Sequence, residues 1–212
     1  MKAVIFDLDG VLVDSEWASS EAWRTALAGF GFRIDEANVE SFVGTTDRAL
    51  ADFFSVHVGE EPSTVLKAAE REMRRKATGG LVAYPDALSV LDRLVIPSAV
   101  ASNSDRWRLE LVLIAAGIRD RFEVSVAGDE VPFPKPAPDI YLRGAALLDV
   151  DAGDCLVIED SPTGLTAARA AGMKVVAVRR GYFEDEELSL ADEIVDSVDS
   201  SSLLTLLTLR DA

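Results

Sequence analysis

Short apolar segments alternate along the chain with longer segments in which apolar residues recur every three or four positions. The short segments have the length and composition of strands buried on both faces. They are Val4–Leu8, Ser98–Ser102, Val124–Ala127, Cys155–Glu159, Lys174–Val178 and Glu193–Val195. Helical spacing lies between most of them, at Asp105–Ala116, Ala137–Leu148 and Pro162–Ala171. This alternation predicts an α/β fold built on a doubly wound parallel sheet.

One interval breaks the alternation. Between Ser15 and Gly80 no buried strand is evident, and one helical pattern follows another. These patterns cover Glu16–Phe30, Glu36–Phe42, Thr46–His57 and Ser63–Thr78. An insert of this length is large enough to form a domain of its own. We therefore predict a catalytic core made of residues 1–14 and 81–212, and an inserted α-helical cap domain at residues 15–80.

The first strand leads directly into two acidic residues. Asp7 and Asp9 follow Val4-Ile5-Phe6, and Gly10 comes next, where it allows a sharp turn. The carboxyl ends of strands are where α/β folds place their ligands. Two crowded carboxylates repel each other unless a cation or a shared proton relieves them, and a hard divalent cation such as Mg²⁺ fits oxygen ligands. The same tetrapeptide also occurs in ordinary turns. Because the insert begins beside these acids, we favour a lid over a site.

Three further strand ends carry polar groups suited to a phosphate. The segment Ser102–Ser104 lies where a helix is expected to begin, so backbone N–H groups there can hold phosphate oxygens. Lys135 lies among four prolines, which reduces the entropy lost on binding. Glu159 and Asp160 end a fourth strand. Taken singly, Ser104 and Glu159 are more typical of helix caps. Together, four such ends of one sheet indicate a single site.

Composition narrows the classes of partner. The formal net charge of −16 repels nucleic acid and anionic membrane surfaces, so we expect neither as a partner, and a phosphate site needs local cations. Cys155 is the only cysteine and is expected in the core, and His57 is the only histidine, which excludes a multi-histidine metal site. No leader segment and no apolar stretch of membrane-spanning length is visible. We expect a cytoplasmic monomer.

Four segments, in order and at proper spacing, resemble the motifs of the haloacid dehalogenase-like hydrolase superfamily. They are Asp7–Glu16, Ser102–Ser104, Lys135–Tyr141 and Glu159–Met173. The likeness is to the branch of small phosphatases and phosphoglucomutases with a helical cap, and it covers essentially the whole chain. Four motifs together are far more specific than one. The resemblance implies a Rossmann-like core and Mg²⁺-dependent hydrolysis of a small phosphorylated metabolite, a sugar phosphate above all.

The resemblance also implies a role for each matching acid. Asp7 is the implied nucleophile, which forms an aspartyl-phosphate. Asp9 is the implied acid that protonates the leaving alcohol and then helps to deprotonate water. Mg²⁺ is implied at Asp7, the backbone carbonyl of Asp9 and Asp160. Glu159 is implied to support these ligands, directly or through water.

The remaining implied roles concern the phosphate and the substrate. Ser102, Asn103 and nearby backbone N–H groups are implied to hold the phosphoryl oxygens. Lys135 is implied to balance the charge on the phosphoryl group and on Asp7. Together with Mg²⁺, this lysine explains how so acidic a protein binds an anion. Residues of the cap are expected to select the substrate, and the candidates are Trp17, Trp23, Thr45, Thr46, Arg48 and Arg75.

Two other activities of the same superfamily, and one non-enzymatic function, are alternatives to a phosphatase. A haloacid dehalogenase needs no metal and lacks the second acid, so Asp9 and Asp160 argue against it. A β-phosphoglucomutase is closer, but that subgroup typically has a histidine where this chain has Ser19. It also has an arginine shortly after the glycine matching Gly44, whereas this chain reaches one only at Arg48. A non-catalytic phosphate-binding regulator is disfavoured because every implied catalytic position is filled. We therefore favour a phosphatase.

Overall fold

The computed structural model describes residues 1–34 and 45–207, so the helix expected over Glu36–Phe42 lies outside the described residues. The chain falls into two compact units. The first consists of Met1–Asp14 and Ala83–Ala212, and the second is Ser15–Val82. The second unit therefore ends at Val82, two residues beyond the end of the cap domain predicted at Gly80.

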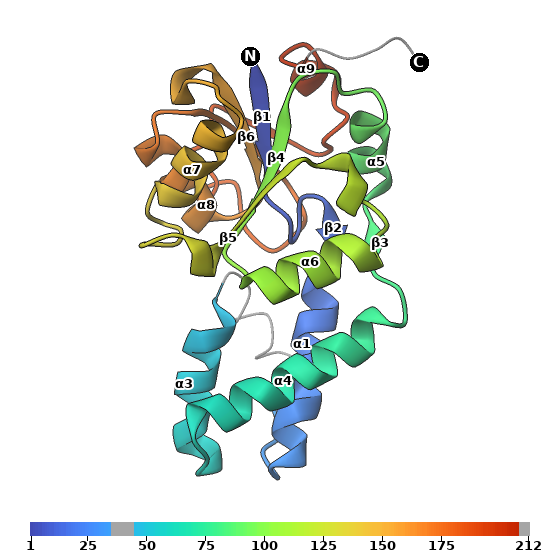
Figure 1. The fold of residues 1–212 in the computed structure, drawn as a ribbon, viewed down its shortest axis with the longest axis vertical. Coiled ribbons are helices and arrows are strands. Elements are labelled where there is room, and N and C mark those ends of the chain that lie inside the picture. Colours follow the sequence, from blue (N-terminus) through green and yellow to red (C-terminus); the bar gives the residue numbers. More distant parts are fainter. Residues whose placement is uncertain (35–44, 208–212) are drawn as a thin grey trace. The chain divides into compact units, whose positions relative to one another are not determined.

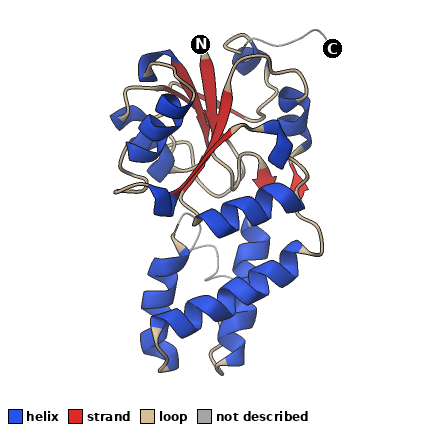
Figure 2. Ribbon diagram, in the orientation of Figure 1, coloured by secondary structure: helices blue, strands red, loops and turns tan. Residues whose placement is uncertain are grey.

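A six-stranded sheet forms the centre of the first unit. Its strand order is β5-β4-β1-β6-β7-β8, and every neighbouring pair is parallel. The strands are β1 (Ala3–Phe6), β4 (Ser98–Ser102), β5 (Val124–Ala127), β6 (Cys155–Glu159), β7 (Lys174–Val178) and β8 (Glu193–Val195). Helices α7 and α8 cover one face, and α5 and α6 lie on the other (Figures 1 and 2). The predicted α/β fold with a doubly wound parallel sheet is confirmed.

The first strand ends earlier than its apolar pattern indicates. Strand β1 stops at Phe6 rather than Leu8, whereas the other five strands have the predicted bounds. The N–H groups of Leu12 and Val13 both donate to the Leu8 carbonyl, which folds the chain back on itself. Gly10 has a φ of +80°, a conformation that residues with a Cβ rarely adopt. The two acids of this segment therefore lie on a tight loop directly after the strand.

Helices of the first unit follow the predicted pattern where the segments are long. They are α5 (Pro85–Leu91), α6 (Arg106–Ala115), α7 (Asp139–Leu147), α8 (Pro162–Ala170) and α9 (Ser201–Leu204). Helix α8 begins as expected, because the Ser161 hydroxyl accepts from the N–H of Gly164 and Pro162 takes the first helical position. Two helices, α5 and α9, were not expected. Nor were the paired strands β2 (Val13–Asp14) and β3 (Val82–Ala83), which are too short to show a period.

The second unit is helical and has an apolar core of its own. Its helices are α1 (Glu16–Gly29), α3 (Asp47–Val58) and α4 (Pro62–Ala77), and α4 packs against both others. The core contains Trp23, Leu27, Phe54 and Val65. The indole N–H of Trp23 donates to the Asp47 carboxylate at 2.9 Å, so this tryptophan packs within the unit. The helices match the predicted pattern over the part of the unit that the structure describes.

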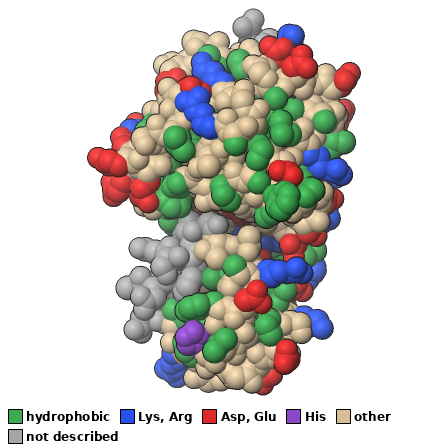
Figure 3. All heavy atoms as spheres, turned by 90° about the vertical axis from the view of Figure 1, so that its left-hand side faces the viewer, with side chains coloured by type: hydrophobic (Ala, Val, Ile, Leu, Met, Phe, Trp, Pro, Cys, Tyr) green, Lys and Arg blue, Asp and Glu red, His purple; other side chains and the backbone are tan. Residues whose placement is uncertain are grey.

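Charged side chains are scattered over the face of the molecule that Figure 3 shows. Acidic side chains gather at several places on the face shown in Figure 3, in keeping with the net charge of −16. No helix within residues 1–34 and 45–207 combines the length and apolar character that crossing a bilayer requires. Cys155 is buried at the start of β6, as predicted, and burial raises the pKa of its thiol to about 11.

An arginine from the far end of the chain holds the loop after β1. Arg180 follows β7, and its Nε donates to the Gly10 carbonyl at 2.9 Å while Nη2 donates to the Val11 carbonyl at 3.3 Å. The same guanidinium pairs with the Asp86 carboxylate at 3.1 Å and lies 3.8 Å from the centre of the Tyr84 ring. Two distant segments of the core, at Tyr84–Asp86 and at Arg180, are thereby tied to the loop that carries Asp9.

Asp86 is the acceptor that keeps this arginine in place. Its carboxylate also accepts from the Val198 N–H at 2.8 Å and from the Ser197 hydroxyl at 3.0 Å. Burial by itself raises the pKa of Asp86, but these hydrogen bonds and the charge of Arg180 hold that pKa below its ordinary value. A carboxyl with a depressed folded pKa stabilises the fold above its unfolded pKa of about 3.9, and the contribution is lost as the pH falls through the folded value.

We expect the substitution Asp86→Ala to lower the free energy of unfolding at pH 7 by about 2–3 kcal/mol, because it leaves the largely covered guanidinium of Arg180, 11% exposed, without its carboxylate partner. Urea unfolding should show the same gap to wild type at pH 7 and pH 5, and a smaller gap at pH 3.5. The control is Asp196→Ala, since that side chain is 87% exposed and should matter by less than about 0.5 kcal/mol. A gap that is the same at all three pH values would contradict the expectation.

Candidate active site

The register of the parallel strands brings the predicted acids together. Phe6 of β1 pairs with Val100 of β4 on one side and with Ile158 of β6 on the other. Asp7 directly follows β1 and Glu159 is the last residue of β6, and the Asp7 N–H donates to the Ile158 carbonyl at 2.9 Å. From β1 the sheet extends through β4 and β5 in one direction and through β6, β7 and β8 in the other. Asp7 therefore lies at the switch point where such sheets bind ligands.

Lys135 occupies the centre of this cluster. Its Nζ donates to Asp7 Oδ1, to Glu159 Oε1 at 2.7 Å and to the Ala101 carbonyl at 3.0 Å. The side chain is only 3% exposed, and Nζ lies 4.8 Å from the centre of the Tyr141 ring. One buried cation is thus shared by two buried carboxylates.

Burial and charge act against each other on these three groups. Burial raises the pKa of Asp7 well above its ordinary value, and the charges of Glu159 and Asp9 add to this while Lys135 opposes it. Burial alone would lower the pKa of Lys135, but Asp7 and Glu159 outweigh it and hold that pKa well above its ordinary value. For Glu159, the charge and hydrogen bond of Lys135 overcome burial and hold its pKa below the ordinary value. The lysine therefore stays protonated, and Glu159 stays ionised and serves as its counter-ion.

Protein donors occupy both oxygens of Glu159. Besides the lysine, the Tyr141 hydroxyl donates to Oε1 at 2.8 Å. The Oε2 atom accepts from the N–H of Asp160, the N–H of Ser161 and the Ser161 hydroxyl, each at 2.9 Å. A Cβ at Gly164 would lie 1.6 Å from Oε1, so the helix behind the carboxylate requires glycine there. These contacts favour the supporting role for Glu159 over direct ligation of a metal.

Asn103 holds the lysine by its backbone. Its Oδ1 accepts from the Lys135 N–H at 2.8 Å, and its Nδ2 donates to the Lys135 carbonyl at 3.1 Å. A Cβ at Gly128 would lie 2.4 Å from the Asn103 carbonyl oxygen, so these two loops approach closely. The carboxamide therefore positions Lys135, which the sequence did not indicate, and direct contact of Asn103 with phosphate stays a prediction.

The Asp9 carboxylate is held by side chains of a single segment. The hydroxyls of Ser102 and Ser104 donate to Oδ2 at 3.4 and 3.3 Å, and Arg108 Nη2 donates to Oδ1 at 3.2 Å. Helix α6 has Asp105 as its N-cap, so the interpretation of Ser104 as a helix cap is wrong. Sequence reasoning missed Arg108, because an arginine on a helix normally faces solvent and only the fold reveals that this one is buried.

Asp160 lies against the loop after β1. A Cβ at Gly10 would lie 2.0 Å from Asp160 Oδ2, so the carboxylate fills the space that the glycine leaves. Asp7 and Asp160 are both buried, and each belongs to a strand end next to the other. The fold thus brings both predicted metal-binding carboxylates to one edge of the sheet.

The charge balance of the cluster fits a divalent cation. Four acids and two bases, a formal charge of −2, are gathered here: Asp7, Asp9, Glu159, Asp160, Lys135 and Arg108. Within the described part of the chain, no three acidic, histidine or cysteine side chains group as a complete metal site. A cation would therefore draw on two carboxylates together with backbone and non-protein oxygens. Such an all-oxygen donor set is the kind that Mg²⁺ prefers.

The specificity candidates belong to the second unit. Trp17, Thr45 and Arg48 are exposed, and Thr46 is the N-cap of α3, where its hydroxyl accepts from the N–H of Ala49 at 3.3 Å. The helix cap accounts for Thr46 without a substrate. Selection of the substrate by these residues stays a prediction.

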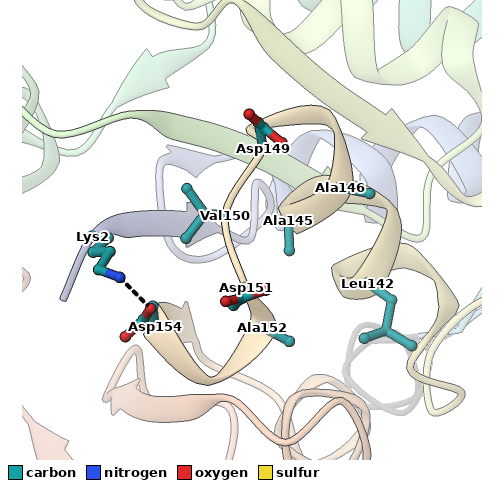
Figure 4. A pocket seen from close by; sticks show the side chains of 9 residues that line it. All are labelled: Lys2, Leu142, Ala145, Ala146, Asp149, Val150, Asp151, Ala152 and Asp154. Carbon is teal, nitrogen blue, oxygen red and sulfur yellow. Dashed lines mark ion pairs between the residues drawn. The ribbon is translucent and has the colours of Figure 1, made fainter.

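A pocket of about 550 Å³ lies at the other end of β1 from Asp7. Lys2, which precedes the strand, pairs there with Asp154 at 2.8 Å, and Asp149 and Asp151 line the same hollow (Figure 4). None of the residues predicted to be functional lines it. The size of a hollow alone is therefore a poor guide to the site in this protein.

Comparison with known proteins places the chain among well-described relatives. A model of the family described as haloacid dehalogenase-like hydrolase matches residues 4–178. The fructose-1-phosphate phosphatase YqaB of Escherichia coli (strain K12) is 32% identical over 181 residues, which cover 83% of this chain and 95% of that protein. The structure of CbbY from Rhodobacter sphaeroides in complex with phosphate is 26% identical, with a TM-score of 0.86 and coverage of 98% and 99%. The β-phosphoglucomutase structure from Clostridium difficile is 25% identical, with a TM-score of 0.81 and coverage of 97% and 96%.

The substitution Lys135→Met should destabilise the fold by about 3–5 kcal/mol at pH 7 in the presence of EDTA, because it leaves the carboxylates of Asp7 and Glu159 buried without their cation. The loss should be smaller at pH 5, since a proton can then take the place of the ammonium between the two acids. Urea unfolding at both pH values measures this. The exposed Lys67→Met is the control. A loss below about 1 kcal/mol, or one that is equal at both pH values, would show that Lys135 does not have this role.

Proposed function

The chain belongs to the haloacid dehalogenase-like hydrolase family, and from this membership we propose that it is a Mg²⁺-dependent phosphatase of a small sugar phosphate. The observation that carries the proposal is the buried Asp7 carboxylate, paired with Lys135 at the switch point of the sheet. The names of the relatives support it, since one is a fructose-1-phosphate phosphatase and another was solved in complex with phosphate. A small phosphorylated metabolite is the proposed partner.

In the first proposed step, an oxygen of Asp7 forms a bond to phosphorus while the bond from phosphorus to the ester oxygen breaks. The electron pair of the broken bond stays on the leaving oxygen, and Asp9 in its protonated form donates a proton to it. Lys135 lies beside Asp7 and balances the charge that the phosphoryl group brings. The products of this step are the free alcohol and an aspartyl-phosphate at Asp7.

In the second step, a water molecule attacks the phosphorus of the aspartyl-phosphate, and the carboxylate of Asp9 accepts its proton. The bond between phosphorus and the Asp7 oxygen breaks, which releases inorganic phosphate and restores the carboxylate. Ser102 and the neighbouring backbone N–H groups hold the phosphoryl oxygens. Mg²⁺, held by Asp7, Asp160 and the Asp9 carbonyl, would supply charge neutralisation on the transferred group.

A mutase of β-phosphoglucomutase type is the alternative within the family. The likeness to the Clostridium difficile enzyme supports it at the level of the fold. Ser19, which lies in α1, supports the phosphatase instead, because the mutase subgroup typically has a histidine at this place. A non-catalytic phosphate-binding regulator is the alternative of another class. It is disfavoured because the acids and the lysine needed for turnover are all present in one cluster.

The purified protein should release inorganic phosphate from members of a sugar-phosphate panel, with fructose 1-phosphate included, when Mg²⁺ is supplied. EDTA should abolish release, and excess Mg²⁺ should restore it. Asp7→Asn keeps the shape but loses the nucleophile, so turnover should fall at least ~10³-fold with the melting temperature unchanged or higher. Asp154→Asn, at the far end of β1, is the matched control and should retain activity. More than a tenth of wild-type activity in Asp7→Asn, or full activity in EDTA, would refute the proposal.

A second assay separates hydrolysis from mutase activity. The protein is incubated with β-glucose 1-phosphate, Mg²⁺ and a trace of glucose 1,6-bisphosphate, and glucose 6-phosphate and free phosphate are both measured. We expect phosphate without isomerisation, because Ser19 provides no imidazole to tie the acid to a bound bisphosphate. Accumulation of glucose 6-phosphate with little free phosphate would establish the mutase.

A further inference from the structure

The two oxygens of the Asp9 carboxylate are held from opposite sides. Oδ1 accepts from Arg108, and Oδ2 accepts from the hydroxyls of Ser102 and Ser104. Because each oxygen has its own donors, rotation of the carboxylate about the bond to its Cβ is restricted. These three donors come from the end of β4, the loop that follows it and the first turn of α6.

Arg108 is more deeply buried than Arg106, which lies on the same helix. Its side chain is 9% exposed, whereas that of Arg106 is 30% exposed. Arg106 bonds to Glu110, Ser125 and Glu130, far from the acids of the site. A guanidinium is costly to bury unless it is paired, so the fold accommodates Arg108 by means of the Asp9 carboxylate.

The arginine is the strongest of the three donors. All three contacts are charge-assisted because the acceptor is a carboxylate, but only Arg108 also carries a positive charge, which adds ionic attraction to its hydrogen bond. The contact from Arg108 is 3.2 Å long, and the serine contacts are 3.3 and 3.4 Å long. Loss of Arg108 should therefore free the carboxylate more than loss of either serine.

We propose that Arg108 is a positioning residue for Asp9, which orients the carboxylate that exchanges a proton with the leaving group. The inference rests on the proposed function, because it assigns Arg108 to the acid–base step of that reaction. Arg108 acts through Asp9 and does not itself touch the reacting atoms. Its effect on the rate must therefore depend on how much the leaving group needs a proton.

The test compares two substrates with different leaving groups. The nitrophenolate of p-nitrophenyl phosphate departs without a proton, whereas the alkoxide of an alkyl phosphate such as fructose 1-phosphate does not. The value of kcat/KM is the measured quantity, because it ends at the first irreversible step, the transfer to Asp7. We expect Arg108→Gln to lower kcat/KM for the alkyl phosphate at least about tenfold more than for p-nitrophenyl phosphate, within the range typical of general acid catalysis. Arg108→Lys, which keeps the charge but not the fork of donors, should show the same bias if the first variant does not fold.

Two further variants separate positioning from stability. Because Arg108 acts through Asp9, the double variant Asp9→Asn with Arg108→Gln should lose no more activity on the alkyl phosphate than Asp9→Asn alone. Arg106→Gln is the matched control, and it should lower the melting temperature while changing kcat/KM for both substrates by the same factor. Equal losses on both substrates in the Arg108 variants, or additive losses in the double variant, would overturn the inference while leaving the phosphatase intact. If the wild type released no phosphate, the proposed function itself would be refuted.

Discussion

One buried ammonium governs the arrangement of the site. Lys135 lies between Asp7 and Glu159, and without it two carboxylates would meet in the interior of the sheet. The two acids in turn hold the lysine charged, since their attraction exceeds the effect of burial on its pKa. Burial raises the pKa of Asp7, and the charge of Lys135 opposes that rise, so the lysine favours the charged form of a carboxylate that burial alone would make neutral. The cluster keeps a formal charge of −2, which fits the divalent cation of the proposed function.

The surroundings of the lysine are arranged to keep its Nζ at one point. Asn103 bonds to both peptide groups of Lys135, so the loop cannot turn away from β4. On the other side, Tyr141 and the turn at Ser161 bind the oxygens of Glu159, and Gly164 leaves the room that this carboxylate needs. Preorganisation of this kind lets charges act on a substrate without first reorienting, which is how electrostatic catalysis is most effective.

The loop after β1 is restrained by two arginines that differ in what they hold. Arg108 binds the side chain of Asp9, and Arg180 binds the backbone carbonyls that follow it. Arg180 lies two residues beyond the segment that the family model matches, and its partner Asp86 lies at the start of α5. The loop that carries Asp9 is therefore held both by the segment after β4 and by a contact from the last part of the chain.

The sequence alone determined the parallel sheet and the members of the acidic cluster. Buried strands and amphipathic helices show in local periodicity, and Asp7, Asp9, Lys135 and Asp160 follow strands whose ends must meet at one edge. The sequence did not predict where β1 ends, nor the short strands β2 and β3, nor helix α5. Segments of only a few residues are too short to show a periodic pattern of apolar positions. The partners of Asp9 and Gly10 were also hidden, since Arg108 is 99 residues from the first and Arg180 is 170 residues from the second. Local pattern states which residues are polar, but only the tertiary structure decides which of them are buried and what each one faces.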